Sequence, residues 1–557
     1  MATLNGYEYI ASYLDLIRGF GLNRGAGEAH YFSNGLAEGR RQGFDSLQYL
    51  ASHRDLAFAF GLNLDAAARH YITSGVNEGR VWDRFDAVQY LRNYADLRAA
   101  FGTDLEAATR HYVASGAREG RSAGAVEAFF AADTPGEGYE LWRVGPNGIF
   151  NPVAYLGAGL EGSLPDNFTS FAGRFFFTAE HPELGRELWR INADGSAQPV
   201  ADINPGVAGS GPLGLTEYRG ELYFAADDGS NGYELWKMRA DGGVGLVADI
   251  MPGGGSSLPI EFTHFNGELY FSADNGSTGI ELWKVRANGS VVQVADIATG
   301  GASSLPHSLI QYNGTLYFAA DNGGIGDELW AVGGAGNVFL AGDIAGGARG
   351  SAPNDFAIAA GELYFSADNP DLGREIWKIR ADGGVQPVAD IAPGTGDSSP
   401  YGFTDLAGEV FFAASDPTFG TELWKVRSDG AVVRVSDIAP GAAAADPGDF
   451  TVFGSELYFS AESAGSGREL YKAAAGGGVV RVTDLEPGAG SSDPTGLVVF
   501  RGELYFTASS PAAGSELWKV TGSGQVVLAG DIAAGGGDSS PYGLTPHGIA
   551  SSGDLLF

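Results

Sequence analysis

From about residue 126 onward the chain repeats one pattern of apolar and polar positions every 47 residues, without insertion or deletion. In each copy, four short stretches rich in aromatic and β-branched residues are separated by clusters of glycine, asparagine, aspartate and proline, which predicts four successive antiparallel strands. One 47-residue copy therefore predicts one four-stranded sheet. Nine copies are present, and eight of them carry a tryptophan at the same phase, with Tyr471 in the remaining copy: Trp142, Trp189, Trp236, Trp283, Trp330, Trp377, Trp424 and Trp518.

The two ends of this array predict that the sheets close into a ring. The first copy begins at AVEAFFAAD, which matches the second strand of the other copies, and the segment GLTPHG at residues 543–548 matches the missing first strand. Closing sheets radially buries both faces of every sheet, whereas an open array would leave unpaired edges exposed. We therefore expect a nine-bladed β-propeller over residues 125–548, with one blade completed by strands from both ends of the array.

The first 124 residues follow a different pattern, in which apolar residues recur every three or four positions, as on one face of a helix. Three copies, spaced by 40 and 41 residues, end in HYFSNGLAEGR, HYITSGVNEGR and HYVASGAREGR. We expect each copy to form two short helices. We also expect Gly35, Gly75 and Gly116 to end the second helix in the left-handed conformation that glycine accepts. The sequence thus predicts a helical module of three repeats of about 40 residues over residues 1–124.

Some positions are the same in all or nearly all of the nine copies, which favours a structural role because a working site usually needs asymmetry. In one copy these are Glu234, Phe224, Trp236 and Asp249. We interpret the glutamate as an acceptor of backbone N–H groups from a turn, the two aromatic residues as core, and the aspartate as a turn cap. The alternatives are a ring of carboxylates that binds cations and an aromatic platform for sugars. The glutamates are Glu140, Glu187, Glu234, Glu281, Glu328, Glu375, Glu422, Glu469 and Glu516.

The loop after the second strand offers candidate calcium ligands. Its aspartate and asparagine side chains lie on glycine-rich turns, and calcium accepts about six to eight oxygen ligands. The spacing follows neither an EF-hand nor the GGxGxD nonapeptide. Calcium is therefore a candidate cofactor, and no other cofactor is expected. The candidate ligands are Asp227, Asp228, Asn231, Asp274, Asn275, Asp321, Asn322 and Asp368.

The composition restricts the partners of the protein. The net charge is -34, and the first 124 residues contribute little to it because they hold 13 arginines, no lysine and 14 acidic residues. An acidic repeat region repels phosphate backbones, so nucleic acid is not an expected partner. Cysteine is absent, which excludes disulfides and cysteine nucleophiles. We find neither an apolar stretch long enough to span a bilayer nor a cleavable N-terminal signal.

Arg40, Arg80 and Arg121 end the three helical repeats and are candidates for holding an anionic polysaccharide. The alternative is ion pairing with the glutamate two positions earlier in the same motif, which is Glu38, Glu78 or Glu119.

Catalytic groups are sparse. Three of the eight histidines occupy one repeat position in the helical module, and the other five share no spacing. The segment GDSSPYG, which occurs twice, belongs to a turn of the repeat and is not a nucleophile elbow. We therefore expect no enzymatic activity.

The strings ELWKVRADG and GELYFSADNG resemble the ELWxxDGT-type repeats of bacterial secreted and cell-surface proteins, although RADGG or RANGS replaces a strict DGT. The resemblance implies a β-propeller. The HYxxxGxxEGR units are similar to short repeats of large secreted, often calcium-associated or surface-layer proteins of Gram-negative bacteria, and imply an extracellular or cell-surface location. The tail SSGDLLF, within residues 549–557, resembles the uncleaved signals of type I secretion substrates. The alternative is that this tail packs on the ring.

These features favour a secreted or cell-surface, non-enzymatic structural protein, such as a surface-layer, matrix or filament subunit. The helical module would anchor or oligomerise it, and identical blades favour self-association over one unique pocket. A module that binds polysaccharide or lipopolysaccharide is the first alternative. A propeller hydrolase or lyase is the second, and it would need an asymmetric set of acids and histidines at the central channel.

Overall fold

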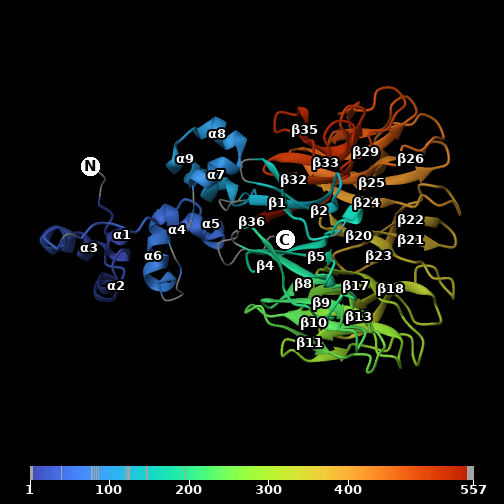
Figure 1. Ribbon diagram of the computed structural model, residues 1–557, viewed down its shortest axis with the longest axis horizontal. Helices are drawn as coiled ribbons and strands as arrows, with labels where there is room; N and C mark the ends of the chain where they lie inside the picture. Colours follow the sequence, from blue (N-terminus) through green and yellow to red (C-terminus); the bar gives the residue numbers. More distant parts are fainter. Residues whose placement is uncertain are drawn as a thin grey trace. The chain divides into compact units, whose positions relative to one another are not determined.

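The computed structural model contains a nine-bladed β-propeller and a small N-terminal helical region, so both predicted folds are confirmed (Figure 1). The structure describes residues 4–548 apart from residues 39, 77–79, 81, 83, 84, 86, 120, 122–125, 146, 147, 158, 193 and 194. Residues 549–557 lie outside the described residues, so the secretion signal stays a prediction. The chain divides into two compact units, formed mainly by residues 1–128 and residues 129–545.

Each helical repeat consists of three α-helices and a π-helical turn, so the expectation of two helices is wrong. The second helix ends at Gly21, Gly61 or Gly102, whose φ values of 51°, 51° and 58° are left-handed. Two residues later an asparagine or aspartate side chain accepts a backbone N–H and begins the third helix. The elements are α1 (Gly6–Ala11), α2 (Leu14–Phe20), α3 (Arg24–His30) and η1 (Tyr31–Gly35); α4 (Ser46–Ser52), α5 (Arg54–Phe60), α6 (Leu64–His70) and η2 (Tyr71–Gly75); α7 (Ala87–Asn93), α8 (Ala95–Phe101), α9 (Leu105–His111) and η3 (Tyr112–Gly116).

Gly35, Gly75 and Gly116 are not left-handed, which corrects the second expectation for this module. They end the π-helical turns, and a Cβ on each would overlap the hydroxyl group of a tyrosine of the same repeat: Tyr9, Tyr49 or Tyr90. These tyrosines are fully buried, and each hydroxyl is hydrogen-bonded to Nδ1 of His30, His70 or His111, at 2.9 to 3.1 Å. The glycine is therefore required by close approach and not by backbone conformation.

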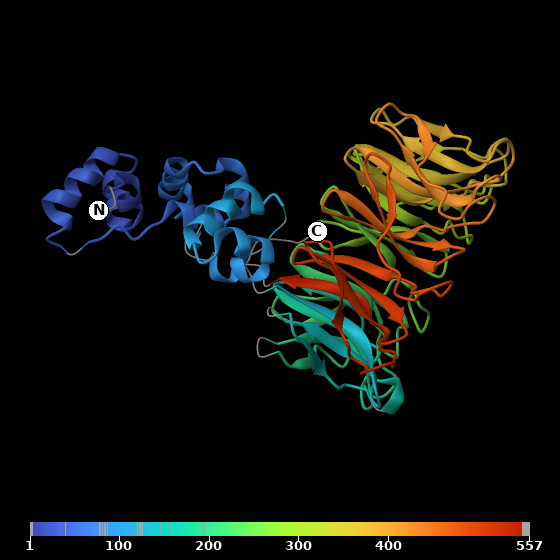
Figure 2. The ribbon, with the colours of Figure 1, turned by 90° about the horizontal axis from the view of Figure 1, so that it is seen from above.

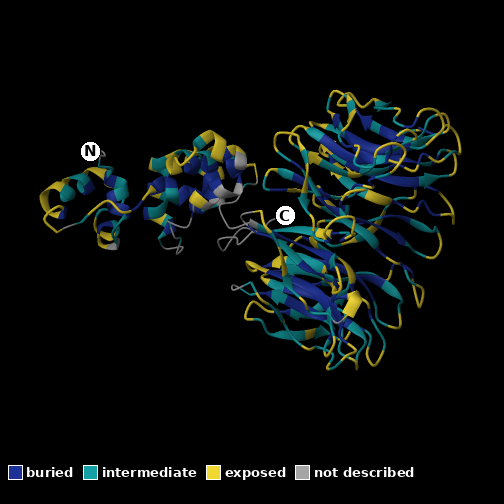
Figure 3. Ribbon diagram, turned by 45° about the horizontal axis from the view of Figure 1, so that its top comes forward, coloured by how far each residue is buried: buried dark blue, intermediate teal, exposed yellow. Residues whose placement is uncertain are grey.

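The helical repeats stack through one recurring pair of elements. The first helix of a repeat packs against the third helix and the π-helical turn of the next repeat, so α1 contacts α6 and η2, and α4 contacts α9 and η3. One apolar core, which includes Tyr9, Tyr49 and Tyr90, runs through all three repeats. Figure 3 shows the buried residues on the inner faces of these helices.

The propeller consists of nine antiparallel four-stranded sheets. The first strands are β4 (Asp166–Phe171), β8 (Leu213–Tyr218), β12 (Ile260–Phe265), β16 (His307–Tyr312), β20 (Asn354–Ala359), β24 (Tyr401–Leu406), β28 (Gly448–Phe453), β32 (Thr495–Phe500) and β36 (Tyr542–Gly548). The second strands are β1 (Val126–Thr134), β5 (Arg174–His181), β9 (Glu221–Asp227), β13 (Glu268–Asp274), β17 (Thr315–Asp321), β21 (Glu362–Asn369), β25 (Glu409–Asp416), β29 (Glu456–Ser463) and β33 (Glu503–Ser510).

The third strands are β2 (Gly138–Val144), β6 (Gly185–Ile191), β10 (Tyr233–Met238), β14 (Ile280–Val285), β18 (Asp327–Val332), β22 (Gly373–Ile379), β26 (Gly420–Val426), β30 (Gly467–Ala474) and β34 (Gly514–Val520). The fourth strands are β3 (Phe150–Ala154), β7 (Ala197–Pro199), β11 (Val244–Ala248), β15 (Val291–Gln293), β19 (Val338–Gly342), β23 (Val385–Ala389), β27 (Val432–Arg434), β31 (Val479–Arg481) and β35 (Val526–Gly530). Blades 1 to 9 are numbered along the chain by their second strands, from β1 to β33.

The ring closes in blade 1, as the ends of the repeat array predict. Strand β36 pairs with β1, and the sheet order is β3-β2-β1-β36. Figure 2 shows this strand, coloured red, beside the strands of blade 1. The hydroxyl of Tyr542 on β36 also donates to the carbonyl oxygen of Pro165 before blade 2, at 3.0 Å. The chain thus completes its first sheet with its last strand, so that β1 is not left as an edge strand.

Apolar side chains fill the space between neighbouring blades. In one such layer, Tyr223 and Leu235 of blade 3 pack with Leu269, Phe271 and Val285 of blade 4. The first strands of successive blades contact one another, so they surround the centre of the ring. Burial of both sheet faces is what a closed propeller supplies to a short four-stranded sheet.

Candidate functional sites

The invariant glutamates are buried hydrogen-bond acceptors at the start of the third strand. All nine are at most 1% exposed. In blade 6, Glu375 accepts the N–H groups of Ile391 and Ala392, each at 3.0 Å, and the hydroxyl of Ser398, at 2.6 Å. Because these donors already occupy both carboxylate oxygens, the geometry fits a structural role and not a ring of cation sites. Burial raises the pKa of eight of them: Glu140, Glu187, Glu234, Glu281, Glu328, Glu375, Glu422 and Glu516.

Blade 7 departs from this arrangement. Ala445 stands where the other blades have the hydroxyl-bearing serine, and the hydroxyl of Ser436 donates to Glu422 instead, at a longer 3.4 Å. The backbone N–H groups of Ile438 and Ala439 still reach the carboxylate at 2.9 Å each. The two backbone donors are therefore the part of the network that blade 7 keeps.

The other repeated positions are also placed for structure. Phe224 lies directly opposite Trp236 in the pairing of β9 and β10, with the phenylalanine fully buried and the tryptophan half-buried. Asp249 is exposed at the turn after the fourth strand. At the same repeat position, Asp343 accepts the N–H of Gly346 at 3.0 Å, which caps the turn. None of these positions forms an open aromatic platform on its own.

The candidate calcium ligands close their own loops. Asp227 accepts the N–H of Gly229 at 2.7 Å, and Asp274 and Asp321 make the same bond at 2.7 Å. Asp228 accepts the N–H groups of Ser230 and Asn231, while Asn275 and Asn322 accept the corresponding pairs in blades 4 and 5. Asp368 pairs with Arg374 at 3.2 Å. Within residues 4–548 as described, no three acidic or histidine side chains come together as a metal site.

The three arginines of the helical module are held by carboxylates. Nη1 of Arg40 donates to both oxygens of Asp15, at 2.8 and 3.0 Å, and its Nε donates to Glu38 at 2.6 Å. Arg121 repeats this with Asp96 and Glu119, and Arg80 pairs with Asp55 at 2.8 Å. Residue 78 lies outside the described residues. The hydrogen bond from Arg40 lowers the pKa of Asp15.

The sequence signal for the aspartate partners was a fixed spacing. Asp15, Asp55 and Asp96 each precede their arginine by 25 residues, whereas the ion-pair hypothesis named only the neighbouring glutamate. A polysaccharide would have to compete with these paired carboxylates for the N–H donors of the guanidinium groups. Polysaccharide binding at these arginines therefore stays a prediction.

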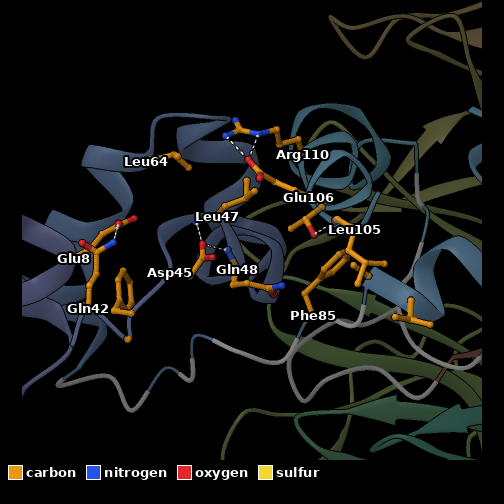
Figure 4. A pocket seen from close by; sticks show the side chains of 15 residues that line it. Glu8, Gln42, Asp45, Leu47, Gln48, Leu64, Phe85, Leu105, Glu106 and Arg110 are labelled. Atoms are coloured by element: carbon orange, nitrogen blue, oxygen red, sulfur yellow. Dashed lines mark hydrogen bonds and ion pairs between the residues drawn. The ribbon is translucent and has the colours of Figure 1, made fainter. Parts of the chain in front are cut away.

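A groove of about 960 Å³ crosses the helical module, and sequence reasoning did not identify it (Figure 4). Its apolar side is formed by Phe44, Leu47 and Phe85, which are 2 to 7% exposed. Four of its polar side chains form two pairs: Gln42 donates to Glu8 at 2.6 Å, and Arg110 donates to Glu106 at 3.0 Å. The groove thus contains no unpaired charge among these residues that would select a ligand.

The first strands around the centre of the propeller carry negative charge. They hold the six acidic residues Asp166, Glu217, Glu261, Asp355, Asp405 and Asp449, and neither lysine nor arginine. Several of these carboxylates join blades: Glu261 accepts the N–H of Ser308 at 2.9 Å, and Asp405 accepts that of Ala360 at 2.6 Å. A shallow pocket of about 320 Å³ lies over β20, β24 and β28. Burial raises the pKa of Asp355, which lines it.

One asymmetric cluster lies in blade 5, where no shared spacing in the sequence revealed it. Nδ1 of His307 is hydrogen-bonded to the hydroxyl of Ser308 at 3.1 Å, and Nε2 is paired with Asp327 at 3.2 Å. His307 and Ser308 are neighbours on β16, and Ser308 has a left-handed φ of 57°. The hydrogen bond to Asp327 raises the pKa of His307. The residue types match those of a hydrolytic triad, but the backbone N–H of Ser308, which an oxyanion hole would use, is donated to Glu261 at 2.9 Å.

We expect His307 to titrate above the ordinary pKa of a histidine, because the hydrogen bond to Asp327 stabilises the imidazolium in the folded state. The pairing of His307 with Asp327 stabilises the folded state fully at pH values below the pKa of an unfolded histidine. This stabilisation is lost as the pH rises through the raised pKa that His307 has in the folded protein. Following the histidine Cε1 signals by NMR across the neutral pH range, with His307→Gln for assignment, measures this. Asp327→Asn should lower the pKa of His307, and an unchanged titration would contradict the pairing.

No protein-family model and no curated protein sequence matches the chain. Solved structures match it as β-propellers. A puromycin-hydrolyzing peptidase of Mycobacterium tuberculosis is 13% identical, with a TM-score of 0.34, and the match covers 67% of this chain and 54% of that one. The β-propeller domain of the Trilobed protease from Pyrococcus furiosus is 11% identical, with a TM-score of 0.29 and coverage of 58% and 98%.

The BP39L lectin from Burkholderia pseudomallei is also 11% identical, with a TM-score of 0.29 and coverage of 56% and 95%. The chain spans 58% and 59% of the length of two puromycin hydrolase structures that it matches. These similarities concern the propeller fold alone. Within the described residues, the helices are all too short or too polar to cross a membrane.

Proposed function

We propose that this protein is a non-enzymatic, self-associating structural protein of the bacterial cell surface or extracellular matrix. The observation that carries the proposal is the burial of the invariant glutamate and phenylalanine in all nine blades. Repetition in this propeller therefore serves the scaffold, and the propeller region carries nearly all of the -34 net charge. A repeated scaffold of this kind, joined to a nearly neutral helical module, suits regular contacts between copies more than recognition of one small molecule.

The likeness of the repeats to ELWxxDGT-type proteins supports a secreted or cell-surface location, and the likeness of the HYxxxGxxEGR units to repeats of Gram-negative surface proteins supports a Gram-negative bacterium. The tail at residues 549–557 would then act as the export signal. Both are proposals, and the first can be tested by locating the protein in fractionated cells and culture medium.

Negative-stain electron microscopy of the purified full chain tests self-association. We expect rings of propeller size joined into arrays or filaments as concentration rises. Calcium should promote this if cations screen the -34 charge, and a chelator should reverse the calcium effect. Single particles at every concentration, with and without calcium, would contradict the proposed function.

A further inference from the structure

The first helical repeat exposes apolar side chains at positions that are buried or half-buried in the other repeats. Phe32 on η1 is 69% exposed, whereas Ile72 and Val113 at the same repeat position are 5% and 1% exposed. One turn later, Leu36 is 55% exposed, whereas Ala117 of the third repeat is 1% exposed. We call Phe32 and Leu36 the open ridge.

The cause is the stacking of the repeats. In the second and third repeats this ridge faces the first helix of the preceding repeat, because α1 contacts η2 and α4 contacts η3. Within the described part of the module, no helix covers Phe32 and Leu36 in the same way, as their exposure shows. The element that fits the open ridge is therefore a first helix like α1, α4 or α7.

The last repeat exposes the opposite side of the same contact. Val88 on α7 is 41% exposed, whereas Leu47 at the same position on α4 is 7% exposed. Helix α4 contacts α9 of the following repeat, while α7 has no following repeat among the described residues. The module thus carries two complementary faces at its two ends.

The outer face of the first repeat is only partly polar, whereas a repeat array is usually capped by a polar face. Glu28 replaces the buried Ala68 and Thr109 at one position, and it pairs with Arg24 at 2.9 Å. The open ridge itself, however, carries larger apolar residues than its buried counterparts. Large exposed apolar groups of this kind mark an interaction surface.

Charge favours the helical module as the place where two copies meet. The propeller region holds nearly all of the -34 net charge, whereas residues 1–124 hold 13 basic and 14 acidic residues. Two propellers repel each other, but two helical modules approach without a large electrostatic penalty.

We propose that the open ridge of one chain packs against α7 of a second copy, so that the stack of helical repeats continues from chain to chain. The contact is heterologous, and successive copies therefore form an open filament or a closed ring. This inference rests on the proposed self-association and names the surface that produces it.

Light scattering coupled to size-exclusion chromatography of the full chain, over a concentration series at moderate salt, tests the contact. Phe32→Glu, Leu36→Glu and Val88→Glu should each reduce the wild-type assembly to the 57.9 kDa monomer. Val207→Glu, at a propeller position that is 76% exposed, should assemble like wild type. Far-UV circular dichroism and thermal unfolding check that every variant is folded.

A mixture of Phe32→Glu and Val88→Glu chains decides the polarity of the contact. The Val88→Glu chain keeps an intact open ridge, and the Phe32→Glu chain keeps an intact α7 face. One chain of each kind can therefore pair, so the mixture should form particles of twice the monomer mass and nothing larger. Dimers of Val88→Glu alone would show a ridge-to-ridge contact and overturn the inference. Wild-type assembly that persists in Phe32→Glu and Leu36→Glu would overturn the inference alone, whereas a monomeric wild type would overturn the proposed function as well.

Discussion

Replacing Glu375 with alanine is expected to lower the free energy of unfolding of the propeller by about 3 kcal/mol or more, because each buried donor that loses its acceptor costs about 1–3 kcal/mol. The substitution leaves the N–H groups of Ile391 and Ala392 and the hydroxyl of Ser398 without their acceptor in a buried site. The cavity left by the side chain adds to this loss.

Glutamine at the same position should cost less than alanine, because its carbonyl oxygen can replace one carboxylate oxygen. Its NH2 group donates hydrogen bonds and cannot accept them, so at least one of the two backbone N–H groups stays unpaired. We expect a loss of about 1–3 kcal/mol for Glu375→Gln.

Blade 7 supplies the matched control, because Ala445 occupies the position of Ser398 in that blade. Ser398→Ala should therefore cost only about 1 kcal/mol, since both backbone donors keep their acceptor. Hydrogen exchange at the amides of Ile391 and Ala392 measures local opening, and denaturant unfolding measures the global effect. Equal losses in Glu375→Ala and Ser398→Ala would contradict the central role of the carboxylate.

The propeller could be predicted from the sequence because the copies of the repeat, and the strands within each copy, can be counted along the chain. A register of 47 residues fixes the blade, and the phase of the segment at residues 543–548 shows which strand the first blade lacks. Strict repetition also identified the buried glutamate and phenylalanine columns as scaffold. This inference does not require knowing which residues contact these side chains, because a side chain that recurs in every blade must find its contacts within that blade and its neighbour.

Contacts between unlike positions could not be predicted in this way. Asp15 and Arg40 are 25 residues apart on different elements. The spacing alone does not show that the path of the chain between them brings the two side chains into contact. His307 and Asp327 occur once, so repetition gives no indication of their pairing. The open ridge is apolar in all three helical repeats, and only the exposure of Phe32 separates it from its buried counterparts.

Glycine was the other source of error, because the sequence does not show which property of glycine a position uses. Gly61 provides a left-handed φ of 51°, and a Cβ there would meet no neighbouring atom, whereas Gly75 provides space against the hydroxyl of Tyr49. Both follow a short helical pattern, and the second was mistaken for the first. The same ambiguity hid the break between α5 and α6 and led to the expectation of two helices per repeat.

This difference between Gly61 and Gly75 gives the second large prediction. Gly75→Ala should destabilise the helical module by about 1–3 kcal/mol, because its Cβ overlaps a hydroxyl in a packed core. Tyr49→Phe alone removes the hydrogen bond to His70, which is 3.0 Å long, and should cost about 1 kcal/mol. The double variant Tyr49→Phe/Gly75→Ala should be more stable than the sum of the two losses predicts, by about 1 kcal/mol, since the overlapping atom is gone.

Gly61→Ala is the matched control for this double-mutant cycle. Its cost of about 1 kcal/mol comes from the left-handed backbone and not from a neighbour, so Tyr49→Phe should not reduce it. Hydrogen exchange measured by mass spectrometry on peptides from residues 46–76 reports the stability of this repeat in the full chain. Additive losses for Tyr49→Phe and Gly75→Ala would show that Gly75 is required for another reason. If Tyr49→Phe instead reduces the cost of Gly75→Ala but not that of Gly61→Ala, the tyrosine hydroxyl is what requires glycine at the end of each π-helical turn.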